Sequence, residues 1–382
     1  MKDISVLTKE FGDLSRWQQR PAFWLDKPDV GMPFLKSLKT AHIQTIGRSA
    51  GGRDIVALEL GAKEPLETTT DNLQSALASC LVPPDPTNIF PPAFYGKTRR
   101  TKPVLALQGG IHGGELTGTV AMLNLCQVVE TGKDLRGKAW PELQELARAT
   151  RLVMIPWLNP DGVDRWPIGN PCGAPADLLA RCGMGVASDG TQYRYPAVKN
   201  IFPIPPAKTA FMGSYFNDAG VNLQYDVCTV DRQPETQAWM RYYLAERPDG
   251  VLIWHCNAGT MMGPPEPFLP EGFQFEFTRL SGAVQSRLWR AGYPVTRMSW
   301  AGLVGMGKPY LSQMSATYHV CGAMPIMAEL PGGGPTPFTA EDLLDIGLLT
   351  IEETLFYAHK DGLRPYEYWE KVKKSMAASA KP

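Results

Sequence analysis

The chain has 382 residues, and its 38 lysines and arginines balance 38 aspartates and glutamates, so the formal net charge is zero. This balance argues against a nucleic-acid binder or a polybasic membrane protein. Hydrophobic residues make up 44% of the chain and charged residues 20%, which is too apolar for a disordered protein. The 37 glycines and 34 prolines exceed average usage and predict long loops around a core, where catalytic residues usually lie.

The cysteines and the N-terminal residues indicate the cellular compartment of the protein. Seven cysteines are scattered without any C-x-x-C pair, which favours a reducing compartment. The N-terminal stretch MKDISVLTKEFGDLSRWQQRPAFW mixes charges and lacks the apolar segment of a signal peptide. No window is apolar for long enough to cross a bilayer. We therefore expect a cytoplasmic protein with neither a membrane nor a nucleic acid as partner.

The order of apolar runs and turns predicts one α/β domain. Residues 1–40 form a lead-in, residues 41–376 the single domain and residues 377–382 a tail. A strand, a glycine-rich bend and a helix follow one another from Val104, which is typical of a largely parallel sheet covered by helices. The predicted strands are His42 to Gly47, Asp54 to Leu60, Val104 to Gly110, a run from Arg151, Val251 to Asn257, and Met324 to Leu330. The predicted helices are residues 119–129, Glu235 to Arg247, Phe275 to Ala291, Ala340 to His359 and Pro365 to Ser375, with a surface insertion at 62–101 and a long loop at 163–221.

Four of these core strands end in a polar residue. The residues are His112, Asn159, His255 and Glu329. In open α/β sheets, ligand sites form beyond the carboxyl ends of the strands. We therefore expect these side chains to converge although they are far apart in the sequence.

His112 and Glu115 are three residues apart in a glycine-rich bend after a buried strand. An imidazole and a carboxylate at that spacing project to one side, and a distant His255 would complete a set that zinc accepts with one position open for water. Chance also produces this spacing, and His255 by itself could be a core histidine bonded to the backbone. The placement of His112 and Glu115 directly after a buried strand and among glycines favours the metal site.

Glu329 ends the nearly uncharged run MPIMAEL. Burying a carboxylate is costly unless it is paired or its pKa is raised. A carboxylate with a raised pKa beside an activated water is a general base, whereas the alternative is a carboxylate that caps the following glycine loop.

Six segments in this order resemble the zinc metallocarboxypeptidases of the carboxypeptidase A-like family, over roughly residues 40 to 360. The segments are GRSAGGRDI (47–55), GGIHGGELTG (109–118), NPDG (159–162), AGVNLQYD (219–226), WHCN (254–257) and MAEL (327–330). The resemblance implies one Zn²⁺ held by His112, Glu115 and His255, with Glu329 as the general base. It also implies a mixed, mostly parallel sheet of about eight strands with helices on both faces.

The same resemblance implies an arginine that stabilises the oxyanion and a tyrosine that covers the substrate. Arg194 is the preferred arginine, with Arg181 and Arg165 as rivals. Tyr310 matches the position of the family's mobile tyrosine, and an ordinary packed aromatic is the alternative.

The sequence differs from this family in the segment that binds the C-terminal carboxylate of the substrate. Family members with that specificity carry a motif of the type Asp-x-Asn-Arg-Asn, and here the stretch reads Asn222, Leu223, Gln224, Tyr225 and Asp226. An arginine binds a carboxylate through two hydrogen bonds, whereas glutamine and tyrosine are neutral and Asp226 would repel it. Asn222, Gln224, Tyr225 and Asp226 are therefore expected to form an altered substrate-binding segment.

These observations predict a zinc metallopeptidase that hydrolyses a peptide or an acylated amino acid with atypical recognition of the chain end. An N-acyl amino acid deacylase or amidase is the alternative, because HGGELTG also resembles the His-Gly-x-Glu box of the aspartoacylase relatives. A non-catalytic binding protein is a further alternative, although such proteins usually lose ligands or the base. The oligomeric state is not predicted.

Overall fold

The structure is a computed structural model of the whole chain. It describes residues 4–65, 100–194, 197–200, 203–257, 260–263, 269, 271–297, 312–360, 363 and 378.

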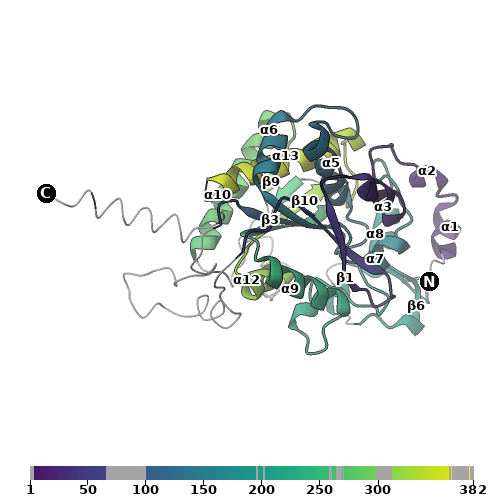
Figure 1. Cartoon of the computed structure of the whole chain (residues 1–382). Coiled ribbons are helices and arrows are strands. Elements are labelled where there is room, and N and C mark those ends of the chain that lie inside the picture. Colours follow the sequence, from purple (N-terminus) through teal and green to yellow (C-terminus); the bar gives the residue numbers. More distant parts are fainter. Residues whose placement is uncertain are drawn as a thin grey trace.

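A mixed eight-stranded sheet crosses the described part of the molecule in the order β1-β2-β4-β3-β7-β10-β8-β9 (Figure 1). Its strands are β1 (His42–Arg48), β2 (Asp54–Leu60), β3 (Val104–Gln108), β4 (Arg151–Ile155), β7 (Gly250–Asn257), β8 (Thr260–Met262), β9 (Val295–Arg297) and β10 (Met324–Pro331). The central neighbours β4, β3, β7 and β10 are parallel. β1, β2 and β4 pair antiparallel, as do β10 and β8. The predicted fold class, a mixed sheet of about eight strands, is confirmed.

Helices cover both faces of this sheet. They are α1 (Ser5–Phe11), α2 (Ser15–Gln18), α3 (Pro28–Ser37), α5 (Thr117–Thr131), α6 (Pro141–Ala149), α7 (Pro160–Arg165), α8 (Ala176–Met184), α9 (Pro234–Glu246), α10 (Glu271–Arg290), α12 (Gln313–Cys321) and α13 (Ala340–His359). Helices α5, α6 and α13 lie on one face, α9 and α12 lie on the other, and α10 packs against α13 (Figure 1). No helix within the described ranges is long and apolar enough to span a bilayer.

The alternation of side chains along the strands builds a core on each face. In β3, Leu105 and Leu107 pack with residues of α5 and α13, whereas Val104 and Ala106 pack with residues of α9 and α12. Successive side chains of a strand point to opposite faces, so a strand that is buried on both faces is apolar throughout. The continuous apolar run of β3 therefore marks it as a central strand.

The N-terminal lead-in packs against the rest of the chain. Leu7, Leu14 and Trp24 are buried and belong to the same apolar core as α5 and α13. The backbone carbonyl of Asp26 accepts a 2.7 Å hydrogen bond from the Trp157 indole.

The prediction of one long loop at residues 163–221 is wrong in part. It contains α8, and β5 (Gly185–Ala187) pairs antiparallel with β6 (Thr209–Met212). The apolar positions Leu178, Leu179 and Cys182 are the buried face of α8, at a helical spacing that the surrounding glycines and prolines obscured. The helix α12 was also missed. The predicted helix at Pro365 to Ser375 and most of the predicted insertion lie outside the described residues.

Candidate metal centre and active site

Three buried side chains form a compact cluster at the carboxyl ends of β3 and β7. One ligand atom from each of His112, Glu115 and His255 lies within 4.8 Å of the other two. Nδ1 of His112 and Nδ1 of His255 each lie 3.0 Å from Oε2 of Glu115. The topology brings these residues together because β3 and β7 are parallel neighbours, so their ends meet at one edge of the sheet.

Two glycines allow the elements around this cluster to approach closely. The turn 112–115 lies against the start of α7, where a Cβ on Gly113 would be 2.0 Å from the backbone of Gly162. At the start of α5, a Cβ on Gly118 would be 2.2 Å from the Trp254 ring. A side chain at either position would push the turn away from the neighbouring element, which explains the glycines in GGIHGGELTG.

The hydrogen bonds around His112 establish which ring nitrogen carries the proton. Nε2 of His112 lies 3.2 Å from Oδ1 of Asn222, and the backbone N–H of Gln224 donates to the same atom at 3.1 Å. Since a backbone N–H only donates, the shared atom is the amide oxygen, and it accepts the Nε2 proton of His112. Asn222 therefore orients the imidazole of His112 through this hydrogen bond.

In the neutral imidazole, Nδ1 of His112 then presents a lone pair toward Oε2 of Glu115, 3.0 Å away. Two acceptor atoms 3.0 Å apart repel each other unless a proton or a metal ion lies between them. Two imidazole nitrogens and one carboxylate oxygen are a donor set that zinc accepts, so the residues present fit a zinc ion.

The electrostatics of Glu115 favour its ionised form. Burial by itself would raise the pKa of Glu115, but when the imidazoles of His112 and His255 are protonated, their positive charge and hydrogen bonds outweigh burial and hold the pKa well below the usual range. The carboxylate is therefore available as an anionic ligand at neutral pH.

Glu329 lies beside this cluster on the neighbouring strand. It is the register partner of His255 in the parallel pair of β10 and β7, so the two side chains project to the same face of the sheet. On its other side it pairs with Met261 of β8. Its side chain is only partly buried, so the burial predicted from its apolar strand is wrong in part, and the carboxylate is accessible to water.

Tyr215 also contacts the cluster, and the sequence analysis missed it. Its ring stacks on the imidazole of His112 with a centroid distance of 3.8 Å and an interplanar angle of 13°. Its hydroxyl donates to Oε1 of Glu115. No motif marked this residue, because its only sequence signal is its position seven residues before Asn222.

Comparisons with known proteins agree with this geometry. Residues 35–168 match the sequence profile of the zinc carboxypeptidase family, a range that contains His112 and Glu115. The fold resembles that of a metallo-carboxypeptidase from Burkholderia cenocepacia, with 15% identity and a TM-score of 0.50, over 86% of this chain and 68% of the other. It also resembles thrombin activatable fibrinolysis inhibitor, with 11% identity and a TM-score of 0.50, over 87% of this chain and 73% of the other. A search of curated protein sequences found no match.

The resemblance to the zinc carboxypeptidases is confirmed. The sequence match and the shared fold together support a zinc metallopeptidase. The match ends before His255 and Glu329, and the topology of the carboxypeptidase-type sheet is what brings these two residues to the matched part of the chain.

Asn159 has a different role from the other residues at the strand ends. Its side chain accepts a 2.9 Å hydrogen bond from the backbone of Gly162 and donates to the carbonyl of Ile111 at 3.3 Å. Asn159 thus caps α7, and the segment NPDG forms the start of this helix. The same asparagine joins the loop before His112 to α7.

The three candidate arginines lie in different environments. Arg194 is exposed. Arg181 pairs with Glu10 of α1 at 3.1 Å. Arg165 is buried and bonds to the Asp218 carboxylate and the Phe216 carbonyl.

The predicted substrate-binding segment lies partly beside the cluster of His112, Glu115 and His255. Asn222 bonds to His112, whereas the carboxylate of Asp226 accepts hydrogen bonds from the Thr229 hydroxyl at 2.9 Å and from the Gln233 backbone at 2.7 Å. Asp226 is only 1% exposed. Both of its oxygens are thus engaged within the protein, whereas Gln224 and Tyr225 are partly exposed. Tyr310 lies outside the described residues.

A buried carboxylate connects the loops that support the site. Asp161 of α7 accepts hydrogen bonds from the Ser49 hydroxyl at 2.5 Å, the Gly51 backbone at 2.8 Å, the Arg53 guanidinium at 2.8 Å and the Asp218 backbone at 3.0 Å. We call these five residues the Asp161 network. It joins the β1–β2 turn, α7 and the segment 213–222, which carries Tyr215 and Asn222.

Glu235 adjoins this network, and its burial predicts that the unfolding free energy of the protein depends on pH. It accepts from the Ala50 backbone at 2.9 Å and from Asn217 at 3.2 Å, and burial together with the negative charge of Asp161 raises its pKa to about 7. The folded protein then holds a proton that the unfolded chain releases near pH 4.5. The stabilisation from this group is complete below about pH 4.5 and is lost as the pH rises through 7.

Glu235→Gln is therefore expected to flatten the pH profile of the unfolding free energy. Relative to the wild type, the variant should gain up to about 3 kcal/mol between pH 5 and pH 8. Urea denaturation at both pH values measures this difference, with the exposed Glu142→Gln as control. Parallel profiles for the wild type and Glu235→Gln would contradict the prediction.

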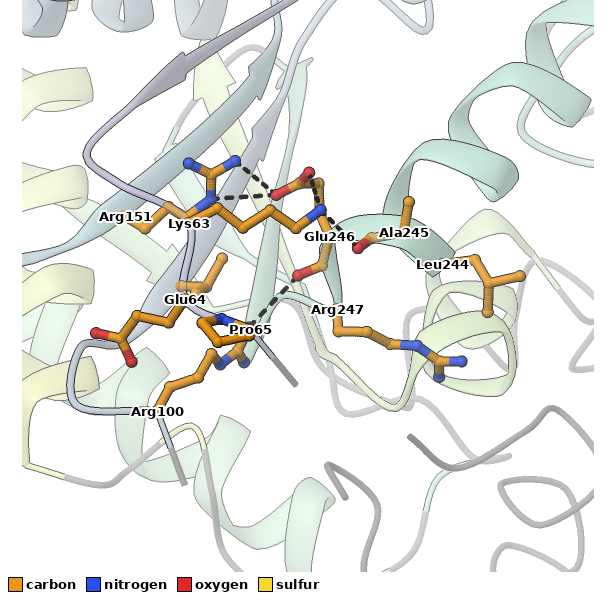
Figure 2. Close-up of a pocket in the computed structure, with 10 residues that line it drawn as sticks. Lys63, Glu64, Pro65, Arg100, Arg151, Leu244, Ala245, Glu246 and Arg247 are labelled. Atoms are coloured by element: carbon orange, nitrogen blue, oxygen red, sulfur yellow. Dashed lines mark hydrogen bonds and ion pairs between the residues drawn. The ribbon is translucent and has the colours of Figure 1, made fainter. Parts of the chain in front are cut away.

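A separate cavity of about 470 Å³ lies at the opposite end of the strands (Figure 2). Lys63 and Arg151 both point toward the Glu246 carboxylate, each at 2.8 Å, and Arg100 pairs with Asp249 at 2.6 Å. Glu246 and Asp249 thus pair with Lys63, Arg100 and Arg151, three of the four cationic side chains that line the cavity. The arrangement is a buried ionic network that joins α9 to β4 and the start of β3.

Proposed function

We propose that the chain is a zinc-dependent hydrolase that cleaves a peptide or amide bond, with His112, Glu115 and His255 as the zinc ligands. The observation that carries this proposal is the convergence of three buried acceptor atoms within 4.8 Å. When bound, a zinc ion supplies a Lewis acid that polarises the scissile carbonyl and lowers the pKa of a water molecule.

Side chains of the protein carry out the remaining steps, which are ligand orientation, proton transfer and stabilisation of the oxyanion. Asn222 holds the Nε2 proton of His112 and so keeps the Nδ1 lone pair directed at the centre. Glu329, on the same sheet face as His255, accepts the proton of the attacking water and delivers it to the leaving amine. Arg194 is the candidate for stabilising the oxyanion, since Arg165 and Arg181 already bind carboxylates.

We further propose that the substrate end near Gln224 and Tyr225 need not be a carboxylate. Both side chains are neutral and partly exposed, and the neighbouring Asp226 is bonded internally. A neutral wall provides hydrogen bonds but no bidentate ion pair, so a free C-terminus and an amidated one should bind comparably.

Metal analysis and paired substrates test this proposal. The wild type is expected to bind one equivalent of zinc and to hydrolyse peptides with free and with amidated C-termini at kcat/KM values within about 10-fold of each other, because losing a neutral hydrogen bond costs about 1.4 kcal/mol or less. Tyr225→Arg should shift the preference toward the free C-terminus. A metal-free wild type would overturn the zinc site, and a strong wild-type preference for the free carboxylate would overturn the proposed end recognition. N-acyl amino acids in the same assay would reveal a deacylase.

A further inference from the structure

The segment that carries Tyr215 is bonded to two sides of the site. Its backbone donates to the end of α8, from Ser214 to Cys182 and from Tyr215 to Gly183, each at 3.0 Å. In the other direction, the Ser214 carbonyl accepts a 2.8 Å hydrogen bond from the backbone of Gly113, next to His112. Tyr215 is therefore fixed relative to the turn 112–115 by main-chain bonds, independently of its own side chain.

The side chain of Tyr215 separates the two oxygens of Glu115. Its hydroxyl donates to Oε1, whereas Oε2 lies 3.0 Å from Nδ1 of both His112 and His255. The oxygen that receives a hydrogen bond is a poorer metal ligand, since one of its lone pairs is already used. The other oxygen is the one directed at both imidazoles.

The ring of Tyr215 acts on the other ligand. It lies parallel to the imidazole of His112, and Asn222 holds the outer nitrogen of the same imidazole. The ring fixes the plane of the imidazole and the amide fixes its rotation within that plane. Phenylalanine would fill nearly the same volume and keep the stacking. The hydroxyl is therefore not needed for packing, and its contribution is the hydrogen bond to Glu115.

We propose that Tyr215 is a positioning residue that makes Glu115 a one-oxygen ligand and holds His112 in its ligating orientation. This inference rests on the proposed zinc site. Residues that orient ligands from outside the coordination sphere typically change metal affinity by about 10- to 100-fold.

Two substitutions separate the hydroxyl from the ring. Tyr215→Phe removes only the hydrogen bond to Glu115, and we expect zinc affinity, measured by competition with a chelator, to fall about 10-fold. Tyr215→Leu removes the stacking as well and should weaken binding further. The Co²⁺-substituted Tyr215→Phe protein should show an altered visible spectrum, because the second oxygen of Glu115 becomes free to coordinate.

The matched control is Tyr193→Phe, which removes a hydroxyl that bonds to Thr209 at 3.1 Å away from the cluster. It should leave zinc affinity and the cobalt spectrum unchanged. Thermal unfolding without metal should be the same for Tyr215→Phe and the wild type, which shows that any loss acts on the metal site. Wild-type zinc affinity and spectrum in Tyr215→Phe would overturn this inference alone, whereas a wild type that binds no zinc would overturn the proposed function as well.

Discussion

Glu329→Gln is expected to lower kcat by about 10²- to 10⁴-fold, the contribution typical of a general base. Glutamine has nearly the same shape as glutamate but cannot accept a proton from the attacking water. Glu329 is separate from the three-atom cluster, although it is in register with His255. The variant should therefore keep one equivalent of zinc and a nearly unchanged KM.

The measurement combines steady-state kinetics with metal analysis of the same preparation. Glu142→Gln, on the exposed start of α6, is the matched control and should retain wild-type rates. Full activity of Glu329→Gln with zinc bound would exclude Glu329 as the base. Loss of zinc together with activity would instead assign Glu329 to the metal site itself.

Asp161→Ala is expected to lower the unfolding free energy by about 3–5 kcal/mol, because it leaves buried donors and an arginine without their carboxylate. Asp161 is fully buried and accepts four hydrogen bonds of the Asp161 network. The segment 213–222 would lose its attachment to α7, so zinc affinity should fall as well.

Urea denaturation measures the stability change, and chelator competition measures the zinc affinity. The control is Asp54→Ala in the β1–β2 hairpin, which breaks the exposed ion pair with Arg48 and should cost less than about 1 kcal/mol. Equal losses for Asp161→Ala and Asp54→Ala would show that the network contributes no more than a surface pair.

The central strands were predictable because they are apolar on both faces. β3, β4, β7 and β10 all follow from continuous hydrophobic runs bounded by turn residues. The short strands β5, β6, β8 and β9 have three or four residues each and carry too few side chains for a pattern. Their existence depends on pairing with partners that are distant in the sequence.

The candidate site residues were predictable for a different reason. His112, His255 and Glu329 are polar residues at the ends of apolar strands, and such a contrast is visible in one sequence. Asn159 shared this signal but caps α7 instead, because its side chain bonds to the backbone three residues ahead. The pattern thus locates strand ends without distinguishing a ligand from a cap.

The fold class, the strand ends and the family resemblance could be predicted without a structure, since they depend on local periodicity and on motif order. Which atoms meet at the site depends on the three-dimensional fold. The hydrogen bond that sets the tautomer of His112 and the one from the Tyr215 hydroxyl to Glu115 each join segments about 100 residues apart. The internal bonding of Asp226 depends instead on local backbone geometry. Hydrogen bonds and ring stacking are directional and short-ranged, so the spacing of residues along the chain does not predict them. The hydrophobic effect is non-directional, so burial of one face of a strand or helix is visible as a periodic pattern of apolar residues.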